Sequence, residues 1–284
     1  MQPPFDFHLH SYHSDGAYAP PDLVARIQQA GVSVFALTDH DTVAGCAATQ
    51  RLAKERGLGF VSGVEISVSW QGRTIHVIGL GIALDHMALL QGLERLSGVR
   101  EARAREMGQR LEKCGIQNAH DQALALAGGG MITRTHFARM LVAGGYALDV
   151  RDVFRRYLVP GKPGYVSVQW AEMQEAVDWI LGSGGIPVLA HPMRYPLTGS
   201  WLRRLGNEFK EMGGQAVEVL SGQCSPGDVQ SSAALARRLG LMASAGSDFH
   251  GPDENWPKLG RLPAMPEGLD TVWSVLRSRG PGWT

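Results

Sequence analysis

The stretch Phe5-Asp6-Phe7-His8-Leu9-His10 decides the fold of this 284-residue chain. Side chains alternate along a strand, so in a strand over residues 5–10 the two histidines point to one face and the apolar side chains to the other. Two imidazoles at this spacing, directly before the loop 11–16, can bind one metal ion from a rigid support. Such a pair is weak evidence by itself, because short motifs often match by accident. The rest of the chain must support it.

The segments that follow alternate between strand and helix patterns. Short apolar runs predict buried strands, and segments bounded by proline and glycine predict helices. Up to residue 80 we predict strands over 5–10, 32–37, 60–70 and 74–80, with helices over 21–31 and 42–57. From residue 171 we predict strands over 186–191, 216–220 and 241–246, with helices over 171–184, 199–212, 225–239 and 269–279. This alternation predicts a mainly parallel α/β sheet or barrel, with a tight turn at residues 71–73.

The middle of the chain breaks this rhythm. Between residues 87 and 159 only helical patterns occur, over 89–114, 118–127, 135–143 and 149–157. The proline- and glycine-rich turn 160–164 closes the segment. We therefore expect residues 1–98 and 166–284 to form the two parts of one barrel, and residues 99–165 to form a small helical insertion that caps the strand ends.

Composition limits the class of protein. Lys plus Arg and Asp plus Glu each number 27, so no overall basic field attracts membranes or long nucleic acid. The three cysteines, Cys46, Cys114 and Cys224, lie far apart and form no CxxC motif, which favours a reduced, cytoplasmic protein. No signal peptide is evident, and no apolar run approaches the ~20 residues that span a bilayer. We expect a soluble protein.

Candidate metal ligands gather at or near the ends of the predicted strands, where barrel enzymes have their active sites. They are His8, His10, His40, Glu65, His191, Asp248 and His250, with Asp15 in the loop after the first strand and His76 in a strand beside Glu65. Any one of these histidines could be a hydrogen-bonded core residue, but chance does not readily explain the whole set. Nine ligands exceed the needs of one ion, so we expect two or three divalent ions bridged by Glu65. Imidazole and carboxylate without thiolate suit Mn, Fe or Zn.

These motifs resemble those of the polymerase and histidinol phosphatase (PHP) superfamily of metal-dependent phosphoesterases. The matching stretches are residues 7–10, 14–16, 37–41, 63–65, 76, 190–192 and 246–250. The resemblance implies a distorted seven-stranded β/α barrel with a metal cluster, often Mn²⁺, at its C-terminal mouth. It also implies how three ions share the ligands: His8, His10, Glu65 and Asp248 for the first, Glu65, His76 and His191 for the second, and Asp15, His40 and His250 for the third.

Two further stretches narrow the branch of the family. Residues 134–138 resemble the Arg-x-His-hydrophobic-Ala motif of nucleoside 3′,5′-bisphosphate phosphatases and short-RNA 5′-3′ exonucleases, and residues 191–195 fit the same branch. Arg134 and Arg194 carry forked cations suited to phosphate oxygens, and His136 could bind phosphate or protonate the leaving oxygen. Arg134 could equally be a solvated residue at a helix start. Lys162 is a weaker candidate that could reach the same mouth from its turn.

Three functions remain open. The first is a phosphoesterase that uses metal-activated water to release the 3′-phosphate of small nucleotides such as adenosine 3′,5′-bisphosphate, or that acts on very short 5′-phosphorylated RNA. The second is a PHP phosphatase for another phosphomonoester such as histidinol phosphate. The third is a non-catalytic, metal-binding accessory module, as in some polymerases. The complete ligand set and the lack of any attached polymerase sequence rank the third last. The sequence leaves the native metal and the oligomeric state open.

Overall fold

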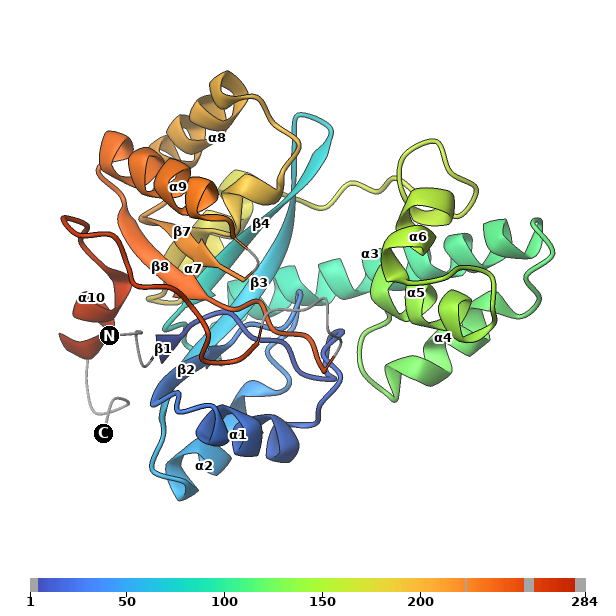
Figure 1. The fold of residues 1–284 in the computed structure, drawn as a ribbon, viewed down its shortest axis with the longest axis horizontal. Coiled ribbons are helices and arrows are strands. Elements are labelled where there is room, and N and C mark those ends of the chain that lie inside the picture. The colour runs from blue at the N-terminus through green and yellow to red at the C-terminus, as the bar shows by residue number, and fades with distance from the viewer. Residues whose placement is uncertain (1–4, 223, 253–257, 279–284) are drawn as a thin grey trace.

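Seven strands follow one another around a nearly closed barrel in the computed structural model, which describes residues 5–222, 224–252 and 258–278 (Figure 1). Their order is β1-β2-β3-β4-β6-β7-β8, and every neighbouring pair is parallel except those made by β4, which is antiparallel to β3 and β6. The strands of this path are β1 Phe5–Asp6, β2 Val34–Leu37, β3 Gly59–Trp70, β4 Arg73–Leu80, β6 Ile186–Leu189, β7 Ala216–Ser221 and β8 Met242–Gly246. The predicted seven-stranded β/α barrel is confirmed.

The first strand brings the two edges of the barrel together. β1 is shorter than the predicted strand over 5–10, but residues 7–10 continue in an extended path beside the end of β8. The N–H of Phe7 donates to the carbonyl of Ala245 at 2.9 Å, and the N–H of His10 donates to that of Phe249 at 3.0 Å. Between these two bonds only one isolated bridge forms, from Leu9 to Phe249, and not a continuous ladder. The regular strand β1 therefore ends before residue 7. The barrel is therefore joined at this point by individual bonds.

A close backbone approach accompanies this junction. Gly246 is the last residue of β8, and a Cβ atom added to it would lie 2.2 Å from Cβ of His8 and 2.6 Å from the backbone nitrogen of His8. Real Cβ atoms essentially never come so close, so only glycine fits without a shift of the backbone. The absence of a side chain at Gly246 thus sets how near the ends of β1 and β8 can lie.

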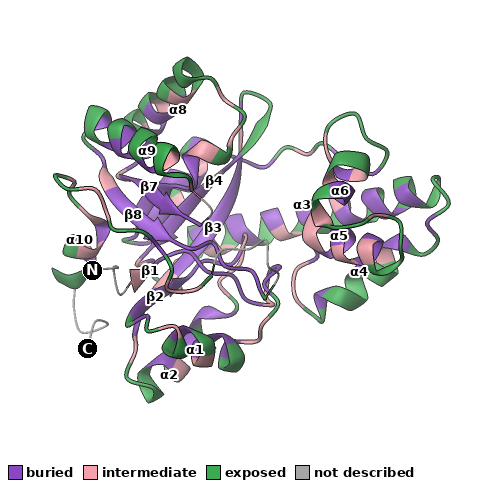
Figure 2. Cartoon of the chain, viewed as in Figure 1, coloured by how far each residue is buried: buried purple, intermediate pink, exposed green. Residues whose placement is uncertain are grey.

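Helices cover the outside of the barrel, with their exposed faces outward and their buried faces on the strands (Figure 2). They are α1 Pro20–Gln29, α2 Cys46–Glu55, α7 Met173–Gly182, α8 Gly199–Glu211, α9 Pro226–Leu239 and α10 Val272–Ser278. The predicted start of α7 was wrong, because Ala171–Glu172 forms a short strand, β5, which pairs with the end of β3. Glu172 and Glu175 then make a reciprocal cap that begins the helix at Met173. The predicted end of the last helix at Arg279 lies outside the described residues.

The β3–β4 hairpin is the longest pairing of the sheet, with eight residue pairs. Its turn residues Gln71 and Gly72 both have positive φ, 49° and 72°, as a tight type I′ hairpin turn requires. The antiparallel return of β4 sets His76 opposite Ser67 and Ile78 opposite Glu65. Because paired residues share a face, Glu65 and His76 point to the same side of the sheet.

The helical insertion extends from the barrel on one long helix, α3 Met87–Glu112 (Figure 1). The first half of α3 buries Leu93 and Leu96 in the barrel core, whereas its second half buries Met107 and Leu111 in a separate apolar cluster. That cluster also receives α4 Ala119–Ala127, α5 Arg134–Ala143, α6 Val150–Val153 and the π-helical turn Phe154–Leu158. Among the described residues, no helix combines the length and hydropathy needed to cross a bilayer.

Candidate metal centre

Five imidazoles surround the carboxylate of Glu65, which β3 holds fully buried at the barrel mouth. Its Oε2 lies 3.4 Å from Nε2 of His8, 3.4 Å from Nε2 of His10 and 2.8 Å from Nδ1 of His40. Its Oε1 lies 3.0 Å from Nδ1 of His76 and 3.0 Å from Nε2 of His191. Both oxygens therefore face nitrogen ligands, the arrangement that a bridging carboxylate needs.

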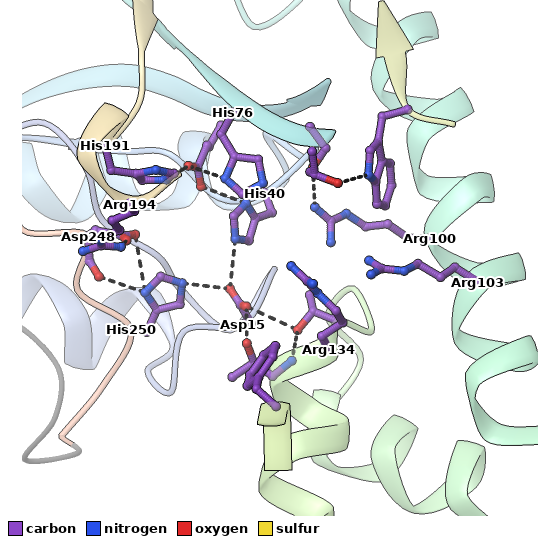
Figure 3. Close-up of a pocket in the computed structure, with 17 residues that line it drawn as sticks. Asp15, His40, His76, Arg100, Arg103, Arg134, His191, Arg194, Asp248 and His250 are labelled. Carbon is purple, nitrogen blue, oxygen red and sulfur yellow. Dashed lines mark hydrogen bonds and ion pairs between the residues drawn. The ribbon is translucent and has the colours of Figure 1, made fainter. Parts of the chain in front are cut away.

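Two aspartates complete the cluster on either side of His10. Asp248 Oδ1 lies 3.0 Å from Nε2 of His10 and 3.3 Å from Nε2 of His8. Asp15 Oδ1 lies 3.3 Å from Nε2 of His250 and 3.8 Å from Nε2 of His40. All nine sequence-predicted ligands thus gather in one cluster, although they come from loops and strands spread over the chain. Figure 3 labels six of them: Asp15, His40, His76, His191, Asp248 and His250.

The ligand atoms fall into three groups whose members lie within 4.8 Å of one another. One is His8, His10, Glu65 and Asp248, the set expected for the first ion. A second combines Asp15, His40 and His250 with His10, and a third joins His40, Glu65 and His76. His191 is outside these groups but contacts Glu65 at 3.0 Å.

The donor atoms fit a cluster of cations. Six of them are buried and make no hydrogen bond among the described residues, although some lie within ion-pair distance of one another: His8 Nε2, His10 Nε2, Asp15 Oδ1, His40 Nδ1, Glu65 Oε2 and His76 Nδ1. An unpaired buried polar atom costs about 1–3 kcal/mol, so such a concentration calls for a ligand. Nitrogen and carboxylate oxygen without sulfur are ligands for borderline and hard divalent ions.

The protonation states of Glu65 and His10 also favour cation binding. Burial opposes ionisation of Glu65, but the imidazoles of His76, His40 and His8 hold its pKa well below the usual value. Burial lowers the pKa of His10 to about 3, helped by the nearby His250. The carboxylate is therefore charged at neutral pH, and His10 is neutral with a lone pair available.

Glu218, in the middle of β7, fixes two ligands and was missed in the sequence. One of its oxygens lies 2.9 Å from Nδ1 of His8, and the other accepts the backbone N–H of His191 at 2.7 Å. An ionised carboxylate can only accept, so Nδ1 of His8 carries a proton, and Nε2 is the ring atom that faces the cluster. The signal was a single acidic residue in the apolar strand Ala216–Ser221.

Three residues after strand ends have backbone angles that L-residues rarely adopt. The φ angles of Asp41, His191 and Asp248 are 51°, 24° and 53°. Such residues cost about 1–3 kcal/mol each and cluster at functional sites. Two of the three are ligands, and Asp41 accepts from Nε of Arg100 at 2.7 Å and from the N–H of Ser67 at 2.6 Å.

A cavity of about 240 Å³ opens over the cluster (Figure 3). Three arginines from α3 and α5 line its other end. Arg100 and Arg103 come from α3, and Arg134 is the first residue of α5. Arg100 pairs with buried Asp41, which ties α3 to the barrel mouth. Of the four arginines lining the cavity, which include Arg194, Arg100 and Arg103 were not recognised in the sequence.

Each of these arginines packs against an aromatic ring. The guanidinium carbons of Arg100 and Arg103 lie 5.1 and 5.4 Å from the ring centre of Trp170, and that of Arg134 lies 5.6 Å from the ring centre of Phe154. Neither Arg103 nor Arg134 has an ion-pair partner within the described part of the chain. Burial lowers the pKa of Arg103 to about 9, with Arg134 and Arg100 as repelling neighbours. The guanidiniums of Arg103 and Arg134 can therefore each accept an anionic partner from a bound ligand.

Asp15 connects the cluster to the insertion. Its Oδ1 faces the histidines, whereas its Oδ2 accepts from the hydroxyls of Thr135 at 2.8 Å and Thr133 at 3.3 Å. Both threonines flank Arg134 at the start of α5. One carboxylate therefore contacts both the metal ligands and the helix end that carries a cavity arginine.

The other predicted substrate residues differ in position. Arg194 lines the cavity, donates to Asp248 and contacts the carbonyl of Gly222 at 2.7 Å. His136 accepts the N–H of Thr133 on Nδ1 at 3.0 Å, which caps α5, and it does not line the cavity. Lys162 is exposed and does not line it either. The roles expected for these three residues stay predictions.

Comparison with protein families agrees with this geometry. The family model for the PHP domain matches residues 6–181. The chain belongs to the PHP family. The barrel is therefore that of a PHP protein, a family of metal-dependent phosphoesterases.

Several PHP relatives are similar over nearly the whole chain. A 3′,5′-nucleoside bisphosphate phosphatase of Chromobacterium violaceum is 45% identical over 275 residues, which cover 96% of each chain. The 5′-3′ exoribonuclease Rnm of Escherichia coli is 44% identical, covering 95% of this chain and 93% of the relative. A solved amidohydrolase structure from Chromobacterium violaceum, with bound sulfate and no metal, has a TM-score of 0.93 at 45% identity, covering 97% of this chain and 96% of that one. A structure from Bifidobacterium adolescentis has a TM-score of 0.81 at 25% identity, covering 96% and 94%.

Proposed function

We propose that this protein is a metal-dependent phosphoesterase that releases the 3′-phosphate of nucleoside 3′,5′-bisphosphates, such as adenosine 3′,5′-bisphosphate, to leave AMP. It also removes nucleotides from short 5′-phosphorylated RNA. The relatives named a 3′,5′-nucleoside bisphosphate phosphatase and a 5′-3′ exoribonuclease support both activities. We infer that the native ions are Mn²⁺. The free thiols of Cys46, Cys114 and Cys224 favour the cytoplasm.

One observation carries the proposal. A single cavity has a metal-ligand cluster at one end and, at the other, two half-buried guanidiniums, Arg103 and Arg134, that have no carboxylate partner among the described residues. A substrate with one phosphate needs only the first end. A substrate with phosphates on both the 3′- and the 5′-oxygen of one ribose supplies an anion to each end.

The side chains divide the work accordingly. Divalent ions bound at the cluster would lower the pKa of water and neutralise phosphoryl charge. Arg103 and Arg134 bind the 5′-phosphate and so orient the ribose with its 3′-phosphate toward the cluster. Trp170 and Phe154 hold these guanidiniums in place from behind. Arg194, which donates to Asp248, keeps a ligand carboxylate aligned and adds positive charge beside the reacting phosphoryl group.

Short RNA fits the same arrangement because the metal end is open. The side chains of His40 and His76 are 12% and 18% exposed, while Glu65 is fully buried. A phosphoryl group at this end can therefore carry further nucleotides that extend into solvent. The 5′-phosphate of the first nucleotide would occupy the arginine end, as in the bisphosphate.

The decisive experiment is phosphate release by Mn²⁺-loaded protein on a small panel. The panel holds adenosine 3′,5′-bisphosphate, adenosine 3′-phosphate, AMP, a 5′-phosphorylated dinucleotide and histidinol phosphate. We expect fast release from the bisphosphate, slow release from adenosine 3′-phosphate and none from AMP. Activity on histidinol phosphate alone would replace this proposal with the second function. Inactivity across the panel with metal in place would favour an accessory module.

A further inference from the structure

One buried carboxylate, that of Asp39, holds the loop that joins His10 to Asp15. Oδ1 of Asp39 accepts the backbone N–H of Ser11 at 2.7 Å and the hydroxyl of Ser14 at 2.6 Å. Oδ2 accepts the hydroxyl of Ser11 at 2.6 Å. Both serines and the aspartate are at most 1% exposed, so bulk water does not compete for these bonds. The loop is therefore fixed by hydrogen bonds within the protein.

Asp39 also contacts the strand that carries the central carboxylate of the cluster. Its backbone carbonyl accepts the N–H of Glu65 at 3.2 Å, and the residue after it is the candidate ligand His40. Asp39 itself offers no atom to the three groups of candidate ligands. It therefore lies between the loop and Glu65 and contacts both, without taking part in the cluster.

Ser14 connects Asp39 to the ring of a ligand. Its Oγ lies 3.4 Å from Nδ1 of His10. Since Oδ1 of Asp39 already accepts a backbone N–H, the Ser14 hydroxyl donates its single hydrogen to that oxygen, and Oγ can offer only a lone pair to the imidazole. The contact between Ser14 and His10 therefore requires a hydrogen on Nδ1.

The two ring nitrogens of His10 face different partners. Nε2 lies 3.0 Å from Oδ1 of Asp248 and 3.4 Å from Oε2 of Glu65. Oδ1 of Asp15 is 4.0 Å from Nδ1, beyond hydrogen-bond distance, whereas Ser14 is within it. Nδ1 is thus the nitrogen on the side of Ser14, and Nε2 is the nitrogen on the side of the candidate ligands.

We propose that Ser14, oriented by Asp39, is a positioning residue that holds His10 in the tautomer required for metal binding. A neutral imidazole that donates from Nδ1 presents the lone pair of Nε2 to a cation. His10 belongs to two of the three groups of candidate ligands, so Ser14 acts on more than one ion site. Glu218 contacts Nδ1 of His8 in the corresponding way. Two acceptors from distant parts of the chain thus fix the two histidines at the end of the first strand.

The metal affinity of two alanine variants tests the proposal. Ser14→Ala removes the acceptor at Nδ1 of His10. Ser11→Ala is the matched control, because it removes the other hydroxyl that Asp39 holds in the same loop, and that hydroxyl bonds no candidate ligand. Calorimetry with Mn²⁺ should show an affinity loss of about 10- to 100-fold in Ser14→Ala and of less than about threefold in Ser11→Ala. Equal losses, or no loss in Ser14→Ala, would overturn the proposal.

A spectroscopic measurement separates the tautomer from a general effect on the fold. In protein loaded with diamagnetic Zn²⁺, Nδ1 of His10 should give an imidazole N–H signal in nitrogen-edited NMR spectra that exchanges slowly with solvent. Ser14→Ala should shift this signal and speed its exchange, whereas Ser11→Ala should preserve it. An unchanged signal in Ser14→Ala would overturn the proposal.

Asp39→Asn distinguishes orientation of Ser14 from the charge of Asp39. The amide oxygen can replace Oδ1 as the acceptor for Ser14, so this variant should keep both the N–H signal of His10 and the metal affinity within about threefold. A loss equal to that of Ser14→Ala would assign the effect to the charge and overturn the proposal. Neither measurement depends on which phosphoester the protein hydrolyses, so both remain decisive if the proposed function fails.

Discussion

The carboxylate of Glu218 contacts Nδ1 of His8 at 2.9 Å, although 210 residues separate them in the sequence. The other Glu218 oxygen accepts the backbone N–H of His191 at 2.7 Å. One side chain on β7 thus fixes the ring of a ligand from the first segment and the backbone of a ligand after β6. Glu218 itself offers no atom to the three groups of candidate ligands.

We therefore expect Glu218→Gln to weaken metal binding while every ligand remains. The amide can accept from only one of the two donors, so either the ring of His8 or the loop at His191 loses its support. Loss of such a partner typically reduces metal affinity by about 10- to 100-fold. Competition with a chromophoric chelator measures the change.

The matched control is Glu211→Gln, since Glu211 is an exposed acid at the end of α8. It should keep the affinity of the unaltered protein, and circular dichroism should report the same fold for both variants. Equal metal affinity in Glu218→Gln and the unaltered protein would contradict the role given to Glu218.

Arg134→Gln tests the arginine end of the cavity. Removing a charge-assisted contact to phosphate costs about 1.5–3 kcal/mol, so kcat/KM for adenosine 3′,5′-bisphosphate should fall by about 10- to 100-fold. Adenosine 3′-phosphate lacks the 5′ group, so its kcat/KM should change little. Arg105→Gln, an exposed position of α3, serves as the control. Parallel losses on both substrates would instead assign Arg134 to the reacting phosphate.

Gly246→Ala should destabilise the barrel at its junction. The added methyl would lie 2.2 Å from Cβ of His8, and the neighbour is a strand-like segment that cannot yield cheaply. Crowding of this kind typically costs about 1–3 kcal/mol in free energy of unfolding. Gly98→Ala is the counterpart, because Gly98 lies within α3 with nothing within 4 Å of its added Cβ. That variant should gain about 0.5–1 kcal/mol in urea unfolding.

His136 makes stability depend on pH. Burial lowers its folded-state pKa to about 4, below the ordinary value of 6.5. Below pH 6.5 the unfolded chain therefore binds more protons than the folded one, so stability falls as the pH falls and the loss is complete below about pH 4. Between pH 7 and pH 5 this group alone should cost about 1–2 kcal/mol.

His136→Gln removes the titration and keeps an acceptor for the N–H of Thr133, since Gln also serves at this position of a capping box. With metal removed from both proteins, urea unfolding at pH 7 and pH 5 should reveal a smaller loss in the variant. Identical losses would mean that His136 titrates normally in the fold.

The sequence predicted the parts of the site that depend on periodicity and residue type. Strand ends followed by histidine or aspartate led to the barrel and to the positions of Glu65, His191 and Asp248. It could not reveal Arg100 and Arg103, because arginines on a helix rich in charge are usually solvated. Two tertiary contacts hold that face of α3 toward the cavity. Arg100 pairs with buried Asp41, and it packs on the ring of Trp170, which lies 70 residues after Arg100 in the sequence.

For His136, the sequence motif predicts a role but not the direction of the side chain. The motif Arg-x-His predicts two substrate-binding side chains, but successive helix positions point in different directions. At the first turn of α5, Arg134 reaches the cavity and His136 turns back to cap its own helix. Likewise β5 escaped prediction because two residues carry no period, and it forms only since β3 extends beyond the barrel.

The two-sided contacts of Asp15 have a thermodynamic consequence. Ions bound at Oδ1 would hold Asp15 in place, and the contacts of its Oδ2 with Thr133 and Thr135 would then favour the position of Arg134 at the start of α5. Metal affinity and nucleotide affinity are then linked functions, and reciprocity requires each ligand to tighten the other by the same factor. At low metal concentration, accumulation of the bisphosphate in a cell would thereby increase the share of the enzyme that carries bound metal.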